Sequence, residues 1–461
     1  MLCRSPTLRA VHALTRPFAG VIHSFSPASL PLLARRSYWL ELITTLFFSI
    51  TLAAVEGGVM GVFTKQSFAG VVGEGRLNAM VALVGAAPEI ANILSFIWAS
   101  ASHGRAKIPF VNALQLAVIL LVAGIALVPR SPAGLVALGV LVIASRVCWS
   151  GIITLRPTIW RVNYPPRVRA RIVGKFATIQ QVTVAGVGLL MGALLDWRES
   201  TAAVVIPLGA AALGLVALLA TSRQRVRTQR AMLSGERSEP ELGRPWHGLM
   251  SLWTVLRRDA RYAQYMICMF VLGFGNLMIT PMLVILFRDE FHRGHFASIL
   301  VITAIPYLLL PLAIPLWARL LDRAHVVRFR SIHAWSFVIS TSVFLLAVVL
   351  HSMPVMILGA LLQGIAVGGG SLAWNLGHVD FAPPARTSQY MAAHVTLNGI
   401  RGLLAPLVAV AMYESLLRSG LDAGTAGAWT LGLSAALAAL GSVGFVALRI
   451  SMGNHAAVRR P

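Results

Sequence analysis

Twelve apolar runs, each long enough to cross a lipid bilayer as a helix, constrain this chain more than any other feature. Hydrocarbon about 30 Å thick requires roughly 20 apolar residues of α-helix, because each residue advances the helix by about 1.5 Å. The runs cover residues 40–64, 77–101, 109–128, 133–158, 172–195, 202–221, 263–287, 297–319, 332–351, 354–378, 388–413 and 426–448. We therefore predict an all-α membrane protein with twelve transmembrane helices.

The composition and the spacing of the runs agree with this prediction. The chain is 57% hydrophobic and 12% charged, whereas a soluble domain carries roughly 25% charged residues. The longest hydrophilic stretch separates the first six runs from the last six, which predicts two six-helix bundles. The expected parts are a basic cytoplasmic extension (1–39), the first bundle (40–221), a linker (222–262), the second bundle (263–450) and a tail (451–461). The linker is expected to end in an amphipathic surface helix from Trp246 to Leu256.

The net charge of +23 arises from 39 Lys and Arg against 16 Asp and Glu. With the N-terminus in the cytoplasm, about 30 basic residues lie inside and about 7 outside, the inner set including the turn from Arg319 to Arg330. The basic residues are spread over short loops without the interleaved aromatic residues that nucleic-acid platforms need. We therefore predict no nucleic-acid partner, both termini in the cytoplasm, and residence in a lipid bilayer, a bacterial inner membrane. A transit peptide is the alternative reading of the first 40 residues, which contain no acid.

Two short segments repeat between the halves of the chain. They read YPPRVRARIVGKFATIQ, from Tyr164, and FAPPARTSQYMAAHVTLN, from Phe381. At an offset of 218 residues, Pro165 aligns with Pro383 and Gln180 aligns with Asn398. Each copy precedes the fifth helix of its half, which favours two parallel six-helix repeats.

Two basic turns, ASHGRAK from Ala101 and LLDRAHVVRFR from Leu320, resemble a signature of the major facilitator superfamily. That family carries Asp-Arg-x-Gly-Arg after its second helix, often repeated after its eighth. The first turn, ASHGRAK, keeps Gly104 and Arg105, with Ala101 in place of the acid, and the second, LLDRAHVVRFR, keeps Asp322 and Arg323. Over residues 38–450 the chain thus resembles this superfamily of secondary transporters. The Gly-Pro of the family's antiporter signature is absent from GVGLLMG on the fifth helix, so the resemblance does not imply antiport.

The resemblance implies that helices 1, 4, 7 and 10 line a central cavity, while helices 2, 5, 8 and 11 meet across the halves. A charged side chain at the centre of the bilayer costs about 2.5–3.5 kcal/mol on insertion scales, so each such residue is expected to have a structural or functional role. Glu56 and Arg146, on helices 1 and 4, would face the cavity, and Arg156 would lie nearer the inner side. Arg146 would bind a substrate carboxylate or phosphate, tune the proton affinity of Glu56, or merely neutralise it.

The stretch HVTLNGIRG on the eleventh helix carries a polar stripe. His394, Asn398 and Arg401 follow i, i+4, i+7 spacing on one helix face, and Gly399 and Gly402 allow a neighbouring helix to come close. Glu89 on helix 2 is expected at similar depth, facing Arg401 across the seam. We interpret this set as an inter-bundle gate. A permanent structural pair, or direct binding of a substrate anion by Arg401, are the alternatives.

The tenth helix supplies a second polar stripe. In QGIAVGGGSLAWNLGH, Ser371, Trp374, Asn375 and His378 share one helix face. Trp374 and Asn375, with Asn276 on helix 7, are expected substrate contacts. An interface anchor for Trp374 and plain helix packing for Asn276 are the alternative interpretations.

Enzyme motifs are absent from the sequence. It has no phosphate-cradling loop, nucleophile elbow or His-Glu-x-x-His pair, so we expect no enzyme activity, cofactor or metal. We expect a monomeric secondary active transporter that moves a small anionic or zwitterionic solute by alternating access. Protonation of Glu56 or Glu89 is the hypothesis for coupling. A transporter-like sensor, receptor or assembly factor is the alternative.

Overall fold

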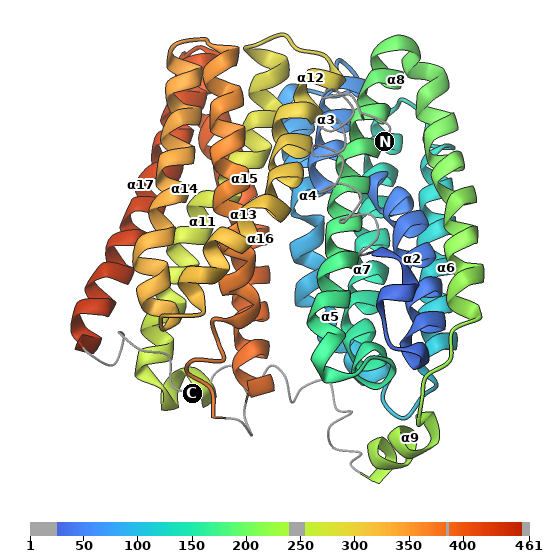
Figure 1. Ribbon diagram of the computed structural model, residues 1–461. Coiled ribbons are helices and arrows are strands. Elements are labelled where there is room, and N and C mark those ends of the chain that lie inside the picture. The colour runs from blue at the N-terminus through green and yellow to red at the C-terminus, as the bar shows by residue number, and fades with distance from the viewer. Residues whose placement is uncertain (1–24, 239–253, 384–386, 454–461) are drawn as a thin grey trace, which may run out of the picture.

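The structure, a computed structural model, describes residues 25–238, 254–383 and 387–453. Within these ranges the chain is helical and has no strand, and its two halves stand side by side (Figure 1). Most of the expected N-terminal extension, residues 239–253 of the linker with the start of its amphipathic helix, and the tail from 454 lie outside the described residues.

The helices fall into two sets along the chain. The N-terminal half contains η1 (Pro27–Ser29), α2 (Leu32–Ala53), α3 (Gly57–Ser67), α4 (Glu74–Ile93), α5 (Ser95–Ala101), α6 (Lys107–Ile125), α7 (Pro132–Asn163) and α8 (Pro166–Ser222), followed by α9 (Gln229–Ser238) of the linker. The C-terminal half contains α11 (Ala260–Asp289), α12 (His295–Ile299), η3 (Leu300–Ala304), α13 (Ile305–Leu321), α14 (Val326–Val349), α15 (Met353–Leu376), α16 (Thr387–Arg418) and α17 (Ala423–Met452).

These helices account for the predicted membrane spans. Ten described segments are long and apolar enough to cross a membrane. One of them, Arg167–Ser222, contains two spans, because α8 turns at Arg198, whose φ of −147° and ψ of 79° are not helical. The remaining span is α4 with α5, which lies outside the ten and carries Pro88 and Glu89 in its middle. The prediction of two six-helix bundles is confirmed.

The first span is not the continuous helix expected over residues 40–64. α2 ends at Ala53 and α3 begins at Gly57, with Glu56 between them in an extended conformation (φ −70°, ψ 132°). A Cβ on Gly57 would lie 3.2 Å from the Gly85 carbonyl oxygen, so α4 approaches the break closely. The carboxylate-bearing Glu56 thus sits at the positive end of the α3 dipole.

The two halves meet mainly through four of the spans, with a smaller contact between α3 and α11. In the N-terminal half α2 packs on α8 and α4 packs on α7, while in the C-terminal half α11 and α14 pack on α17. Between the halves, α16 packs on α4 and α13 packs on α8. Helices 2, 5, 8 and 11 therefore form the seam, as the resemblance implied.

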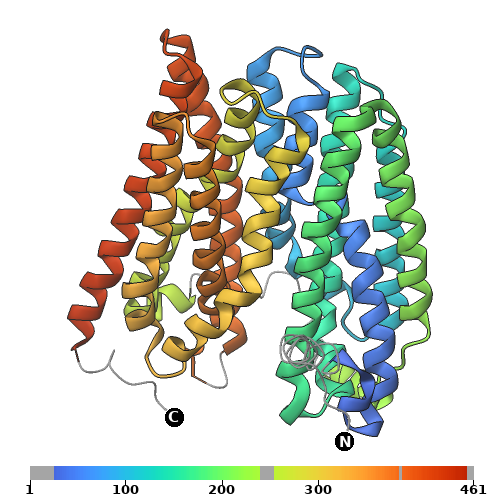
Figure 2. The same cartoon turned by 45° about the horizontal axis from the view of Figure 1, so that its top comes forward.

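The ends of the bundles differ in what they carry. We call the end with α9 and the connections 102–106, 164–165 and 322–325 the linker end, and the end with the connections 68–73, 126–131, 290–294 and 419–422 the far end. Figure 2, turned by 45°, shows the same two halves side by side with both ends in view. Successive spans alternate between these ends.

Candidate functional site

A buried network of charges joins the halves at the far end. The side chain of Lys65 on α3 is fully buried, and its Nζ lies 2.7 Å from Glu74 Oε2 and 2.8 Å from Asp289 Oδ2 of α11. Lys65 also donates to Asn78, which in turn donates to Glu414 of α16 at 2.6 Å. These bonds tie α3 and α4 to α11 and α16.

A second contact closes the far end between α8 and α12. Asp196 accepts hydrogen bonds from the backbone N–H groups of His295, at 2.7 Å, and Phe296, at 2.9 Å, and lies 2.9 Å from His295 Nδ1. We call the bonds of Lys65 and Asp196 together the far-end clasp. The sequence analysis did not single out Lys65 or its partners, which come from distant parts of the chain.

Glu56 and Arg146 form an ion pair, and Arg146 is not among the lining residues of the two cavities described below. Arg146 Nη1 donates to Glu56 Oε2 at 3.2 Å, and Tyr307 of α13 donates its hydroxyl to Glu56 Oε1 at 2.7 Å. The side chains of Arg146 and Glu56 are 10% and 12% exposed, so this pair is largely removed from water. Tyr307, which the sequence did not single out, connects the pair to the C-terminal half.

A cavity of about 160 Å³ adjoins this pair and is lined by Glu56, Tyr307, Asn276 and Gln363 among others. Asn276 Oδ1 accepts from Gln363 Nε2 at 2.8 Å, and Gln363 Oε1 accepts from Ser340 at 2.8 Å. Asn276 also lines a second, larger cavity. It therefore stands between the Glu56 pair and the larger cavity.

The expected pairing of Glu89 with Arg401 takes a different form. Asn398 lies between them, donating through Nδ2 to Glu89 Oε2 and accepting through Oδ1 from Arg401 Nη2. Among the described residues no ion pair joins Glu89 directly to Arg401. Asn398 intervenes because it lies one turn before Arg401 on the same face of α16.

The other members of the stripe have separate contacts. Arg401 Nη1 donates to the Met269 carbonyl oxygen of α11. His394 does not reach Glu89 but packs edge-on against Trp374, with ring centroids 5.6 Å apart. A Cβ on Gly402 would collide with Glu89, which explains the close approach of α4 and α16.

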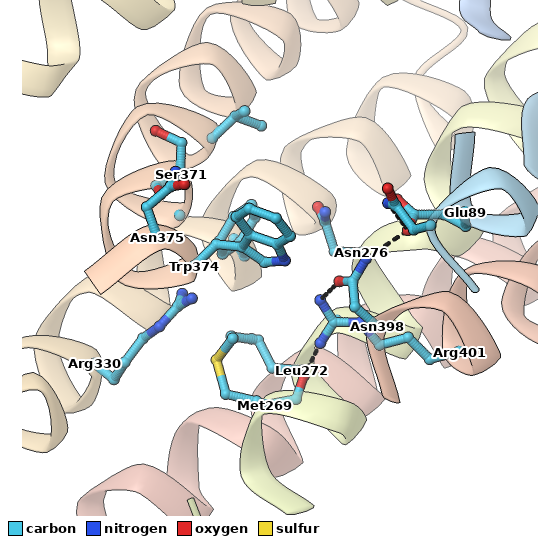
Figure 3. A pocket seen from close by; sticks show the side chains of 15 residues that line it. Glu89, Met269, Leu272, Asn276, Arg330, Ser371, Trp374, Asn375, Asn398 and Arg401 are labelled. Carbon is cyan, nitrogen blue, oxygen red and sulfur yellow. Dashed lines mark hydrogen bonds between the residues drawn. The ribbon is translucent and has the colours of Figure 1, made fainter. Parts of the chain in front are cut away.

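The larger cavity lies at the seam and measures about 330 Å³. Its polar lining includes Glu89, Asn276, Arg330, Trp374, Asn375, Asn398 and Arg401. Figure 3 shows Arg330 and Arg401 entering from opposite sides with the indole ring of Trp374 between them. Asn375 is exposed and donates to the Ser371 carbonyl oxygen at 2.7 Å.

Arg330 is a lining residue that the sequence interpretation missed. It was counted with the basic turn before the ninth helix, but α14 begins at Val326 and carries Arg330 inward. Arg330 is 3% exposed, Nη1 lies 3.3 Å from His333 Nδ1, and Nε has no hydrogen-bond partner among the described residues. The apolar residues on either side gave no reason to separate it from the other basic residues of the turn.

Arg156 has a carboxylate partner that the sequence interpretation also missed. Arg156 Nε lies 3.2 Å from Glu41 Oε1, and Glu41 accepts further hydrogen bonds from Trp160 at 3.1 Å and Gln224 at 2.6 Å. The Arg156 guanidinium also lies over the rings of Trp149 and Trp160, at 5.6 and 5.9 Å from their centroids. The charge of Arg156 is neutralised within the N-terminal half, although its Nη2 has no hydrogen-bond partner among the described residues.

The signature turns lie at the linker end. Gly104 has a φ of +67°, which favours glycine, and its N–H donates to Glu236 of α9 at 2.7 Å. Partial burial would raise the pKa of Glu236, but hydrogen bonds from Lys107 and Gly104 outweigh it and hold the pKa below its ordinary value. Arg105, Asp322 and Arg323 are exposed.

Comparison with known proteins identifies the family. The family model described as Major Facilitator Superfamily matches residues 46–406, so the chain belongs to this superfamily. It is an integral, multi-pass membrane protein with a secondary-transporter fold and is not an enzyme. No curated protein sequence matches the chain.

Solved transporters share the fold at low sequence identity. A D-xylose–proton symporter matches with a TM-score of 0.66 at 15% identity, over 89% of this chain and 96% of that one. PepTSo, a transporter of the POT family, matches with a TM-score of 0.68 at 14% identity, over 91% of this chain and 99% of its own. A variant of the nucleoside transporter NupG matches with a TM-score of 0.64 at 14% identity, over 90% of this chain and 100% of its own.

Proposed function

We propose that this protein is a secondary active transporter that moves a small solute by alternating access through the 330 Å³ cavity. The observation that carries the proposal is the position of this cavity. Both halves line it, Glu89 from α4 and Arg330, Trp374 and Arg401 from the C-terminal half, so relative motion of the halves would change access to it.

The charge distribution supports an orientation. The basic turns, including Arg105 and Arg323, gather at the linker end, and under the positive-inside rule this supports our proposal that the linker end faces the cytoplasm. The far-end clasp then closes the outer side, and the exposed Asn375 marks access from the inside. With this orientation the structure corresponds to an inward-facing state, and a bacterial inner membrane is the location that we propose.

Glu56 is the residue that we propose couples transport to protons. Its carboxylate accepts from Arg146 of the N-terminal half and from Tyr307 of the C-terminal half, so it holds the two together. Protonation removes its negative charge and weakens both bonds, which links proton binding to separation of the halves. Glu89, bonded across the seam to Asn398, is the second candidate for the same role. The matching D-xylose symporter is named for its coupling to protons.

Transport from a mixed solute pool tests this proposal. Proteoliposomes holding the purified protein are offered a labelled extract of small metabolites, with and without an imposed pH gradient, and their contents are measured by mass spectrometry. We expect at least one solute to accumulate only with the gradient. We expect Glu56→Gln to lose accumulation but retain exchange of that solute between the two sides.

Two outcomes count against the proposal in different ways. Accumulation by Glu56→Gln with an unaltered pH dependence would remove Glu56 from the proton path. If the folded wild type moves no solute under either condition, transport fails, and the sensor, receptor or assembly-factor interpretation takes its place.

A further inference from the structure

The larger cavity contains a buried positive charge that no carboxylate of the described residues neutralises. Arg330 is 3% exposed, its Nε has no hydrogen-bond partner within the described part of the chain, and its Nη1 lies 3.3 Å from an imidazole nitrogen of His333. No carboxylate of the described residues forms an ion pair with it. Because an unpaired buried charge is costly, such a group calls for a counter-ion.

The charges of the whole cavity point the same way. Its charged lining residues are Arg330, Arg401 and Glu89. Glu89 is already held by Asn92, at 2.9 Å, and by Asn398, and Arg401 is held by Asn398 and the Met269 carbonyl oxygen. Two positive charges against one negative charge leave an excess of one. A ligand with a single negative charge would balance the site, whereas a phosphate dianion would overcompensate it.

The walls of the cavity define the rest of the ligand. Met269, Leu272, Phe337 and Val367 form an apolar lining, and the Trp374 ring lies between the two arginines (Figure 3). A planar guanidinium pairs with both oxygens of a carboxylate, and an indole face packs against an apolar or aromatic body. A cavity of about 330 Å³ suits a molecule of metabolite size.

We propose that this cavity binds an organic monocarboxylate, with its carboxylate on the Arg330 guanidinium and its apolar body against Trp374. Arg401 faces the ligand from the other side and holds the Glu89 side of the cavity through Asn398. The inference rests on the proposed function, because it names the class of solute that the transport cavity accepts.

A binding experiment on the purified protein in lipid nanodiscs tests the inference. The melting temperature is measured with straight-chain and phenyl-substituted monocarboxylates of two to ten carbons, with the primary amide of each acid, and with phosphate monoesters of matching bodies. We expect at least one monocarboxylate to raise the melting temperature by several degrees in a saturable manner. We expect its amide and its phosphate ester to bind at least tenfold more weakly.

Variants locate the binding site. We expect Arg330→Gln to weaken binding of the active carboxylate at least tenfold, and Arg330→Lys, which keeps the charge but loses the fork, to weaken it less. Arg319→Gln, at the exposed linker end of α13, serves as the matched control and should bind as the wild type does. Size-exclusion chromatography shows whether each variant is folded. If Arg330→Gln does not fold, binding by Arg330→Lys still tests the inference.

Three results would overturn the inference. They are equal binding of acid and amide, unchanged carboxylate binding by folded Arg330→Gln and Arg330→Lys, and no binding by any acid of the series. Failure of transport is a separate result. A carboxylate that binds but does not exchange across proteoliposomes overturns the transporter proposal alone, while transport of a neutral or cationic solute without carboxylate binding overturns this inference alone.

Discussion

The two halves of the molecule bury arginine in different ways. In the N-terminal half, Arg146 lies 3.2 Å from Glu56 and Arg156 lies 3.2 Å from Glu41. In the C-terminal half, Arg330 and Arg401 have no directly paired carboxylate among the described residues and face a cavity instead. The N-terminal half therefore neutralises its own charge, whereas the C-terminal half leaves a positive charge for a ligand.

The largest effect on stability is expected at Glu41. Glu41→Gln leaves the Arg156 charge buried without its partner, and breaking a buried pair in this way costs about 3–5 kcal/mol of unfolding free energy. Denaturant unfolding of the detergent-solubilised protein measures the loss. The double variant Glu41→Gln/Arg156→Gln should recover most of it. Equal stability of the single variant and the wild type would show that Arg156 does not depend on Glu41.

The far-end clasp should give the next largest effect. Lys65→Gln removes the charge that binds Glu74 and Asp289, and we expect it to weaken closure of the far end by about 2 kcal/mol, roughly thirtyfold in the ratio of closed to open states. Electron spin resonance distances between labels at Ala69 and Ser419 measure the separation of the halves there. An unchanged distance distribution would mean that other contacts hold this end closed.

Arg330 provides the contrast with Glu41. Arg330→Gln removes a buried charge that has no carboxylate partner among the residues that the structure describes, so we expect the unfolding free energy of the ligand-free protein to stay the same or rise by up to about 1 kcal/mol. The same unfolding measurement as for Glu41→Gln checks this. A loss of several kcal/mol in unfolding free energy would show that groups of the protein itself stabilise the Arg330 charge. The two halves would then not differ in how they bury arginine.

The smallest effect is expected where α9 docks on the linker end. Despite partial burial, which would raise it, the pKa of Glu236 is lowered in the folded protein by its contact with Lys107. This contact therefore stabilises docking of α9 fully at pH values above the ordinary pKa of 4.5, and the stabilisation is lost as the pH falls through the lowered pKa. Glu236→Gln at neutral pH should weaken docking by up to about 1 kcal/mol. Spin-label distances between α9 and α6 measure it, and a pH-independent distance in the wild type would contradict the assignment.

Much of the fold follows from the sequence because bilayer thickness fixes the length of each apolar run. The two spans of α8 were separable at the polar stretch around Arg198. The break before Gly57 was not predicted, although VEGGVMG contains the glycines that permit it, because apolar length does not distinguish a continuous helix from two short ones. α3 and α4 approach each other where Gly57 meets Gly85, a contact that depends on tertiary packing.

Less of the candidate site than of the fold could be predicted from the sequence. The i, i+4, i+7 spacing placed Asn398 and Arg401 on one face of α16, but it did not show that Asn398 would intervene between Arg401 and Glu89. Arg330 was assigned to a loop because the start of α14 is marked by His325, whose side chain caps the helix, and not by a change in hydropathy. Partners distant in sequence, such as Tyr307 for Glu56, depend on tertiary packing.

The most direct test of the central claim is exchange of a labelled monocarboxylate across proteoliposomes containing wild type, Arg330→Gln or Arg319→Gln. The labelled acid is the member of the series that raises the melting temperature of the wild type most. The account predicts rapid exchange by wild type and by Arg319→Gln, and exchange at least tenfold slower by Arg330→Gln. Exchange by Arg330→Gln at the wild-type rate would contradict it, because the unpaired charge of the C-terminal half would then have no part in holding the solute.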